Sequence, residues 1–203
     1  MKPLRPSSLL LALLTGLGFV ACTESTSPSP PAPVTAACQL RMEGAVIQYN
    51  GRPLPLPGSL AAWEAVLGPP SRRVEVADEV YVWDELGLHA FAREAGTPLR
   101  GVFVLLKLRT NPDRSPPPYW PRTPFKGHLC VDGSEVTPTT SLAEVNQNKR
   151  GQKFSKGYLD TIYSYDLPAP VALYVRLDLT EDRKLESFSM SLADETILRG
   201  EQK

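Results

Sequence analysis

The sequence has no excess of charge of either sign, because 22 lysines and arginines balance 22 aspartates and glutamates. A basic surface is what draws a protein to DNA or to an anionic membrane surface. Removal of the first 21 residues would take away Lys2 and Arg5 but no acidic residue, which leaves the remainder slightly acidic. The sequence therefore predicts no nucleic-acid partner.

Motifs of the common catalytic and cofactor sites are also missing. The chain has no Gly-rich phosphate loop, no nucleophile elbow and no metalloprotease helix. His89 could act as a general base, but no nucleophile or orienting acid has a recognisable motif beside it. One group of carboxylates could bind calcium or do acid–base work, although such residues at turns are more often solvated: Asp78, Glu79, Asp84 and Glu85. We therefore expect no catalytic residue, no cofactor and no enzymatic activity.

The chain begins with an apolar run that is too short to cross a membrane. Residues 9–20 are uncharged, but a hydrocarbon core needs about 20 such residues. Lys2 and Arg5 precede the run, as the positive region of a signal peptide precedes its apolar region. Residues 1–21 are thus expected to be a signal peptide.

The residues at the end of this run are Phe19-Val20-Ala21-Cys22. They resemble the lipobox of bacterial lipoproteins, in which a small residue precedes the cysteine that is lipidated. Ala21 and Cys22 match that pattern, whereas Phe19 stands where Leu is usual. The resemblance implies cleavage before Cys22, attachment of lipid such as palmitate to Cys22, and anchoring to a membrane of the cell envelope. In a Gram-negative cell this would be the outer membrane, on its periplasmic or surface side. The alternative is an ordinary secretory signal with an incidental cysteine.

A tether is expected at residues 22–37, because this segment is rich in Ser, Thr and Pro and holds one charge, Glu24. It cannot bury enough apolar surface to offset the entropy of ordering it. Prolines at 28, 30, 31 and 33 favour an extended spacer. Such a spacer would hold a domain, residues 38–203, off the bilayer.

If Cys22 carries lipid, Cys38 and Cys130 remain as a pair. In an exported protein such a pair is expected to form a disulfide, which would join the start of the domain to its middle. A metal site is the rival, but these cysteines with His89 and His128 lack the short spacings of zinc sites. We expect the disulfide and no metal.

An internal repeat is suggested when the sequence is shifted by 82 positions, which places residues 46–86 on residues 128–168. The matched positions have the roles of hairpin turns and helix N-caps: Asn50-Gly51 and Asp132-Gly133, and Ser59 and Ser141. We expect an α+β fold of two tandem pseudo-repeats. Each would contain a hairpin, a helix and an antiparallel meander, with the helices packed on one sheet face. In outline this is similar to secreted β-lactamase-inhibitor proteins.

The two halves are expected at residues 38–110 and 126–203. The first should contain strands near 45–49, 52–56, 74–76, 80–83, 88–92 and 101–108, and the second strands near 128–131, 154–159, 162–165, 171–179 and 185–192. Ser59 and the capping-box pair Ser141 and Glu144 should begin the helices. The first half also contains Leu60 to Trp63, Leu67-Gly68 and the run from Tyr81 to Gly87. These residues resemble a family of uncharacterised bacterial domains over about 46–136, which implies a fold but no activity.

The loop that joins the halves, residues 111–125, is rich in proline and carries Tyr119-Trp120 at its centre. Rigid backbone that holds large rings suits a binding surface, so Tyr119 and Trp120 are candidate partner-binding residues. The alternative is a strap whose rings pack on the core. The sequence thus favours a membrane-anchored envelope lipoprotein, a non-enzymatic module of inhibitor or immunity type that binds an envelope protein or ligand. A structural or assembly lipoprotein, or an enzyme with an unrecognised site, remains as an alternative.

Overall fold

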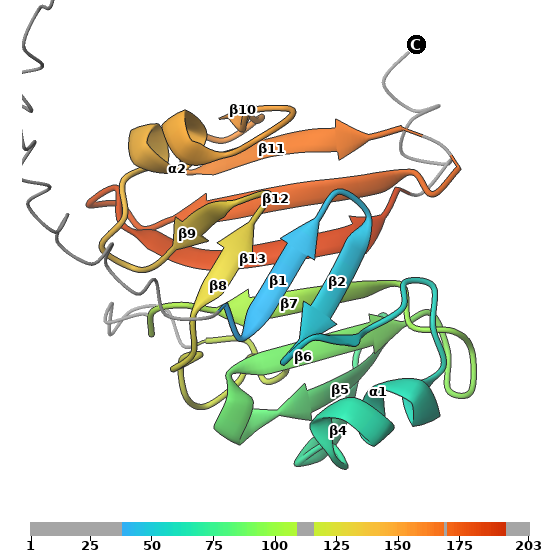
Figure 1. Ribbon diagram of the computed structural model, residues 1–203. Coiled ribbons are helices and arrows are strands. Elements are labelled where there is room, and N and C mark those ends of the chain that lie inside the picture. The colour runs from blue at the N-terminus through green and yellow to red at the C-terminus, as the bar shows by residue number, and fades with distance from the viewer. Residues whose placement is uncertain (1–37, 109–115, 169, 194–203) are drawn as a thin grey trace, which may run out of the picture. The chain divides into compact units, whose positions relative to one another are not determined.

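The computed structural model describes residues 38–108, 116–168 and 170–193. The expected signal peptide, Cys22 and the tether of residues 22–37 lie outside the described residues. Most of the regular secondary structure in these residues is β-strand, arranged as one sheet of eight strands and one of five (Figure 1). No helix in this part of the chain has the length and apolar character needed to cross a bilayer.

The eight-stranded sheet has the order β10-β11-β12-β13-β7-β6-β5-β4, and all neighbours are antiparallel. Two meanders of four strands each, β4 to β7 and β10 to β13, meet where β7 pairs with β13. The bounds are β4 Arg72–Glu75, β5 Glu79–Trp83, β6 Leu88–Ala92, β7 Gly101–Leu105, β10 Ser155–Lys156, β11 Ile162–Leu167, β12 Leu173–Leu179 and β13 Leu185–Leu192.

The five-stranded sheet has the order β3-β2-β1-β8-β9. Its strands are β1 Leu40–Glu43, β2 Val46–Tyr49, β3 Arg52–Pro53, β8 Leu129–Val131 and β9 Ser134–Val136. β1 pairs with β8 in parallel, with Leu40 opposite Leu129. The disulfide between Cys38 and Cys130 lies beside this pair, with 5.8 Å between the two Cα atoms, so the predicted disulfide is confirmed.

One cluster of buried side chains includes residues from both sheets. Met42 and Val131 come from the five-stranded sheet, and Val104 and Phe188 from the eight-stranded sheet, each with no exposed surface. Figure 1 shows β1, β2 and β8 crossing over the central strands β13 and β7. Burial of each such side chain stabilises the fold by about 1.5–3 kcal/mol. The core is therefore the layer between the two sheets.

Two α-helices are described, α1 at Leu60–Leu67 and α2 at Leu142–Asn148, with a 3₁₀ turn at Asp84–Leu86. The side chain of Ser59 caps α1, and Ser141 and Glu144 form the capping box of α2, which satisfies backbone N–H groups that a helix start leaves unpaired. Each helix buries a single side chain, Trp63 or Val145.

The expected α+β class is wrong, because the described chain is mostly β. The two helices are too short to cover a face of the eight-stranded sheet, and the five-stranded sheet covers it instead. The arrangement in tandem halves is wrong as well. Both sheets draw strands from residues 38–110 and from residues 126–203, so neither half has a sheet of its own. Strand β1 is absent from the expected strands, although it pairs both with β2, next to it in sequence, and with the distant β8.

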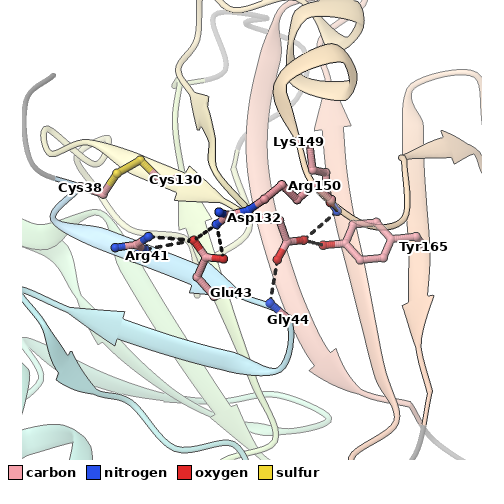
Figure 2. Close-up of polar contacts among 9 residues, drawn as sticks. All are labelled: Cys38, Arg41, Glu43, Gly44, Cys130, Asp132, Lys149, Arg150 and Tyr165. Carbon is pink, nitrogen blue, oxygen red and sulfur yellow. Dashed lines mark hydrogen bonds and ion pairs between the residues drawn. A yellow bond between two sulfur atoms is a disulfide. The ribbon is translucent and has the colours of Figure 1, made fainter. Parts of the chain in front are cut away.

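A buried polar cluster ties the two sheets and α2 together (Figure 2). Asp132 lies in the β8–β9 turn and has 8% of its surface exposed. One carboxylate oxygen accepts a hydrogen bond from Gly44 N at 2.6 Å. The other accepts from the Tyr165 hydroxyl of β11 at 2.9 Å and lies 2.7 Å from Lys149 Nζ, just after α2.

Every group of this cluster has a partner. Lys149 Nζ also donates to the carbonyl oxygens of Arg150 and Gln152, and lies 4.0 Å from the centre of the Tyr165 ring. Burial first, and then the charge of Asp132, raise the pKa of Tyr165 above its usual value, so its hydroxyl stays protonated and donates. The polar groups of the cluster are thus engaged with one another, and its role is to stabilise the fold.

Replacing Asp132 with Asn should lower the free energy of unfolding by about 3 kcal/mol, because Lys149 then keeps a buried charge without a counter-ion. Asn tolerates the φ of 47° at this position. The control is Glu43→Gln, which breaks the exposed pairs of Glu43 with Arg41 and Arg150 and should cost less than about 1 kcal/mol. Urea unfolding of both variants checks this. Equal losses would contradict it.

Candidate functional site

The eight-stranded sheet has an outer face, turned away from the core, that changes from polar to aromatic along one row. Residues directly opposite one another in successive strands make up this row: Arg176 in β12, Ser189 in β13, Phe103 in β7, His89 in β6 and Val82 in β5. Side chains opposite one another on one sheet face are in contact range. The row therefore places an arginine and a serine beside two rings.

Residues 116–125, here called the strap, lie on the aromatic part of this row. The ring of Trp120 packs on Phe103 with 5.1 Å between centroids, and the ring of Tyr119 meets His89 edge-on at 5.7 Å. Both strap rings are half-buried. The rings thus pack on the sheet, but on its outer face and not on the core as the strap alternative expected, and neither residue is fully buried.

The buried carboxylate of Asp84 holds the strap in place. It accepts two hydrogen bonds from Arg72, the shorter at 2.8 Å, and one from Arg122 N at 2.8 Å. Arg72 in turn donates to the backbone oxygens of Pro118 and Trp120. Burial by itself would raise the pKa of Asp84, but the hydrogen bonds and charges of Arg72 and Arg122 hold it below its usual value. The ionised Asp84 thus fixes the strap through its backbone.

Gly87 allows the strap to approach the sheet. It has a φ of 67°, and a Cβ at this position would lie 2.2 Å from the backbone nitrogen of Phe125. That nitrogen donates to Leu105 O at 2.7 Å, at the end of β7. Any side chain at position 87 would push the end of the strap away from the sheet.

A shallow depression of about 350 Å³ lies where the strap ends and the polar part of the row begins. A second, of about 340 Å³, lies on the other side of Tyr119, and the two share His89, Phe91 and Tyr119. The first depression is also lined by one further ring from the sheet, two strap residues and three polar residues: Phe103, Pro117, Trp120, Arg176, Asp178 and Ser189. We call it the aromatic depression, and it is the candidate site.

His89 is 5% exposed and stacks on Phe103 with 4.6 Å between centroids. Burial lowers the pKa of His89 from 6.5 to about 3, against a hydrogen bond to the backbone of Tyr119 that raises it, and the charge of Arg72 lowers it further. The imidazole is therefore neutral near pH 7. A base with this pKa is poorly matched to proton abstraction at neutral pH.

Of the four carboxylate candidates, Asp78 lines the second depression together with His89, and Glu85 is exposed. Glu79 is buried beside Arg73, and Asp84 beside Arg72, so both serve ion pairs. Within the described ranges, no three His, Cys, Asp or Glu side chains are placed to hold a metal ion.

Sequence reasoning found Tyr119 and Trp120 but missed most of the lining of the aromatic depression. Phe91, Arg176 and Asp178 are ordinary alternating strand residues in the sequence, with no motif around them. Only the strand register brings them beside the strap. The alternation of polar and apolar residues in β12 was the one available signal, since it marks Arg176 and Asp178 as outward-facing.

Replacing His89 with Phe should make stability less dependent on pH. Because the pKa of His89 is lower in the folded chain, the unfolded chain binds one more proton between about pH 3 and 6.5. His89 therefore destabilises the fold as pH falls through this window, by up to about 1.4 kcal/mol per pH unit. Urea unfolding at pH 6 and pH 4 should show that the free energy of unfolding falls less between these two pH values for His89→Phe than for the wild type. His128→Phe, which removes a half-exposed imidazole, is the control, and a loss in His89→Phe as large as that in the wild type would refute the assignment.

Comparison with known proteins places the chain in a family. The family described as "Domain of unknown function (DUF7738)" matches residues 39–146, more than half of the chain. The chain belongs to this family of domains of unknown function. The expected resemblance to an uncharacterised domain family is thereby confirmed. No curated protein matches the chain.

Among solved structures, a cysteine-rich secretory protein from Staphylococcus aureus subsp. aureus Mu50 is similar at a TM-score of 0.36 and 10% sequence identity. The match covers 70% of this chain and 46% of that protein, so the chain spans less than half of its length. A likeness at this level says nothing about the activity of this chain.

Proposed function

We propose that this chain is a lipid-anchored protein of a bacterial cell envelope, and that its folded domain is a non-enzymatic module that binds an envelope ligand. The observation that carries the binding proposal is the aromatic depression. It joins exposed parts of Tyr119 and Trp120 to a fixed polar pair, Arg176 and Asp178. Aromatic rings that are rigid before binding lose little entropy when a ligand arrives.

The rigidity of the rings supports a binding role. Trp120 and Tyr119 pack on rings of the sheet, and Arg72 holds the backbone of the strap through its carbonyl oxygens. Aromatic residues in such settings supply much of the energy at interfaces. In the aromatic depression the one imidazole is neutral and stacked, which favours binding over acid–base chemistry.

The anchoring proposal rests on the positive residues Lys2 and Arg5, the apolar run of residues 9–20, and Cys22. The disulfide between Cys38 and Cys130 supports export, because disulfides persist in oxidising compartments such as the periplasm and are rare in the cytosol. Residues 22–37 would be the spacer between lipid and domain.

Replacing Cys22 with Ser should release the protein from the membrane fraction, because the proposed lipid can no longer be attached. Fractionation of cells, with a salt wash of the membranes, checks this, and labelling with a palmitate analogue should be lost in parallel. Thr23→Ser is the control and should stay in the membrane fraction. A Cys22→Ser protein that remains in washed membranes would disprove the anchor.

Replacing both Tyr119 and Trp120 with Ala should weaken capture of an envelope ligand by roughly 2 kcal/mol or more. The strap should stay in place, because Arg72 contacts backbone oxygens that Ala retains. The immobilised Cys22→Ser protein, with and without this change, is incubated with an envelope extract, and circular dichroism checks folding. Val46→Ala, an exposed residue of the other sheet, is the control. Equal capture by folded wild-type and double-variant protein would exclude the aromatic depression as the binding surface.

A further inference from the structure

Phe91 gives the aromatic depression a flat platform. Its cross-strand partner in β7 is Gly101, and a Cβ at Gly101 would lie 2.3 Å from the Phe91 ring. The Phe91 ring thus lies across β7 at Gly101, because glycine has no side chain that would collide with it. Phe91 is half-buried and lines both depressions, so an exposed part of the ring faces the space between the strap and the sheet.

The polar end of the aromatic depression is fixed in position. Arg176 donates to one oxygen of Asp178 from Nε at 2.8 Å and from Nη2 at 2.5 Å. The other oxygen of Asp178 accepts from the Ser187 hydroxyl at 2.9 Å. The side chains of Arg176 and Asp178 are 30% and 15% exposed. They therefore offer further donors and acceptors to a ligand without having to reorganise.

The charges of the lining argue for an uncharged ligand. The aromatic depression contains one cation and one anion, Arg176 and Asp178, and these neutralise each other. A charged ligand would find no unpaired counter-charge there, and it would lose hydration that is not replaced. The ligand must still have hydroxyl or amide groups for the polar end and apolar C–H surface for the rings.

Pyranose sugars have this combination. The C–H groups on one face of a sugar ring form an apolar surface that can stack on Phe91, Tyr119 or Trp120. The hydroxyl groups of the sugar can accept hydrogen bonds from Arg176 and donate them to Asp178. The planar guanidinium and carboxylate groups of these two residues suit pairs of neighbouring hydroxyls. A volume of about 350 Å³ lies at the small end of the range for ligand sites. A proline-rich peptide could also stack on the rings, but it would make no use of the polar end.

We propose that the aromatic depression binds uncharged hexopyranose units of a glycan, with Phe91, Tyr119 and Trp120 as the stacking platform and Arg176, Asp178 and Ser189 as hydrogen-bonding partners. This inference rests on the proposed function, since it names the ligand of the same surface. Because the depression is shallow and open, it suits sugar units within a longer chain as well as a free oligosaccharide.

The test titrates the full-length Cys22→Ser protein with tri-N-acetylchitotriose, cellotriose and maltotriose, and follows tryptophan fluorescence and heat of binding. At least one should bind with Kd of about 1 mM or tighter. The deacetylated chitosan trimer, which has the same backbone with charged amines, should bind about tenfold more weakly than tri-N-acetylchitotriose if that is the ligand. Binding of the corresponding insoluble polymer, measured by sedimentation, separates a glycan chain from a free sugar.

Two variants test the two ends of the aromatic depression. Phe91→Ala should weaken binding of the sugar about tenfold or more by removing the platform. Asp178→Asn keeps the shape of the polar end and should weaken binding of the sugar by a similar factor. This second variant keeps the test valid if Phe91→Ala does not fold. Val46→Ala, on the other sheet, should bind like the wild type.

The outcomes separate this inference from the proposed function. If none of the three oligosaccharides binds but capture from the envelope extract still depends on Tyr119 and Trp120, the saccharide assignment is overturned and the binding function stands. The saccharide assignment is also overturned if a proline-rich peptide competes for capture and Asp178→Asn has no effect. If neither sugar binding nor ring-dependent capture is found, both proposals fail.

Discussion

The carboxylate of Asp132 is the contact on which the arrangement of both sheets depends. It joins the β1–β2 turn at Gly44, the end of α2 at Lys149, and strand β11 at Tyr165 (Figure 2). The cluster is buried, so its charges cannot separate without a large cost in free energy. Hydrophobic burial between the sheets is non-directional, whereas these hydrogen bonds have fixed lengths and angles. The cluster therefore helps to set where the sheets lie on one another, and β11 carries β12 and β13 with it.

The strap determines which part of the outer face of the eight-stranded sheet is covered. An antiparallel sheet can leave one face to water, but here residues 116–125 cover part of that face over the half formed by β4 to β7. Asp84 and Arg72 hold this cover through backbone atoms, and the rings of Tyr119 and Trp120 add their packing on His89 and Phe103.

The aromatic depression is lined both by residues within the family match, 39–146, and by residues after it. Its rings lie at residues 89–120, within the region that matches the family, whereas Arg176, Asp178 and Ser189 lie beyond residue 146, where the match ends. The two groups meet because β7 pairs with β13 at the centre of the sheet. The family is one of unknown function, so only the chemistry of these side chains indicates what the aromatic depression could bind.

Local sequence determined the features that need only neighbours along the chain. The hairpin turn at Asp132-Gly133 and the capping residues Ser59 and Ser141 are confirmed, because turns and caps depend on residues a few positions apart. The Cys38–Cys130 disulfide could be predicted by counting cysteines. The tertiary structure alone decided the fold class and the lining of the site. The parallel pairing of β1 with β8 and the row from Arg176 to His89 join residues that are distant in sequence. Their register depends on the packing of both sheets, and no local pattern contains that information.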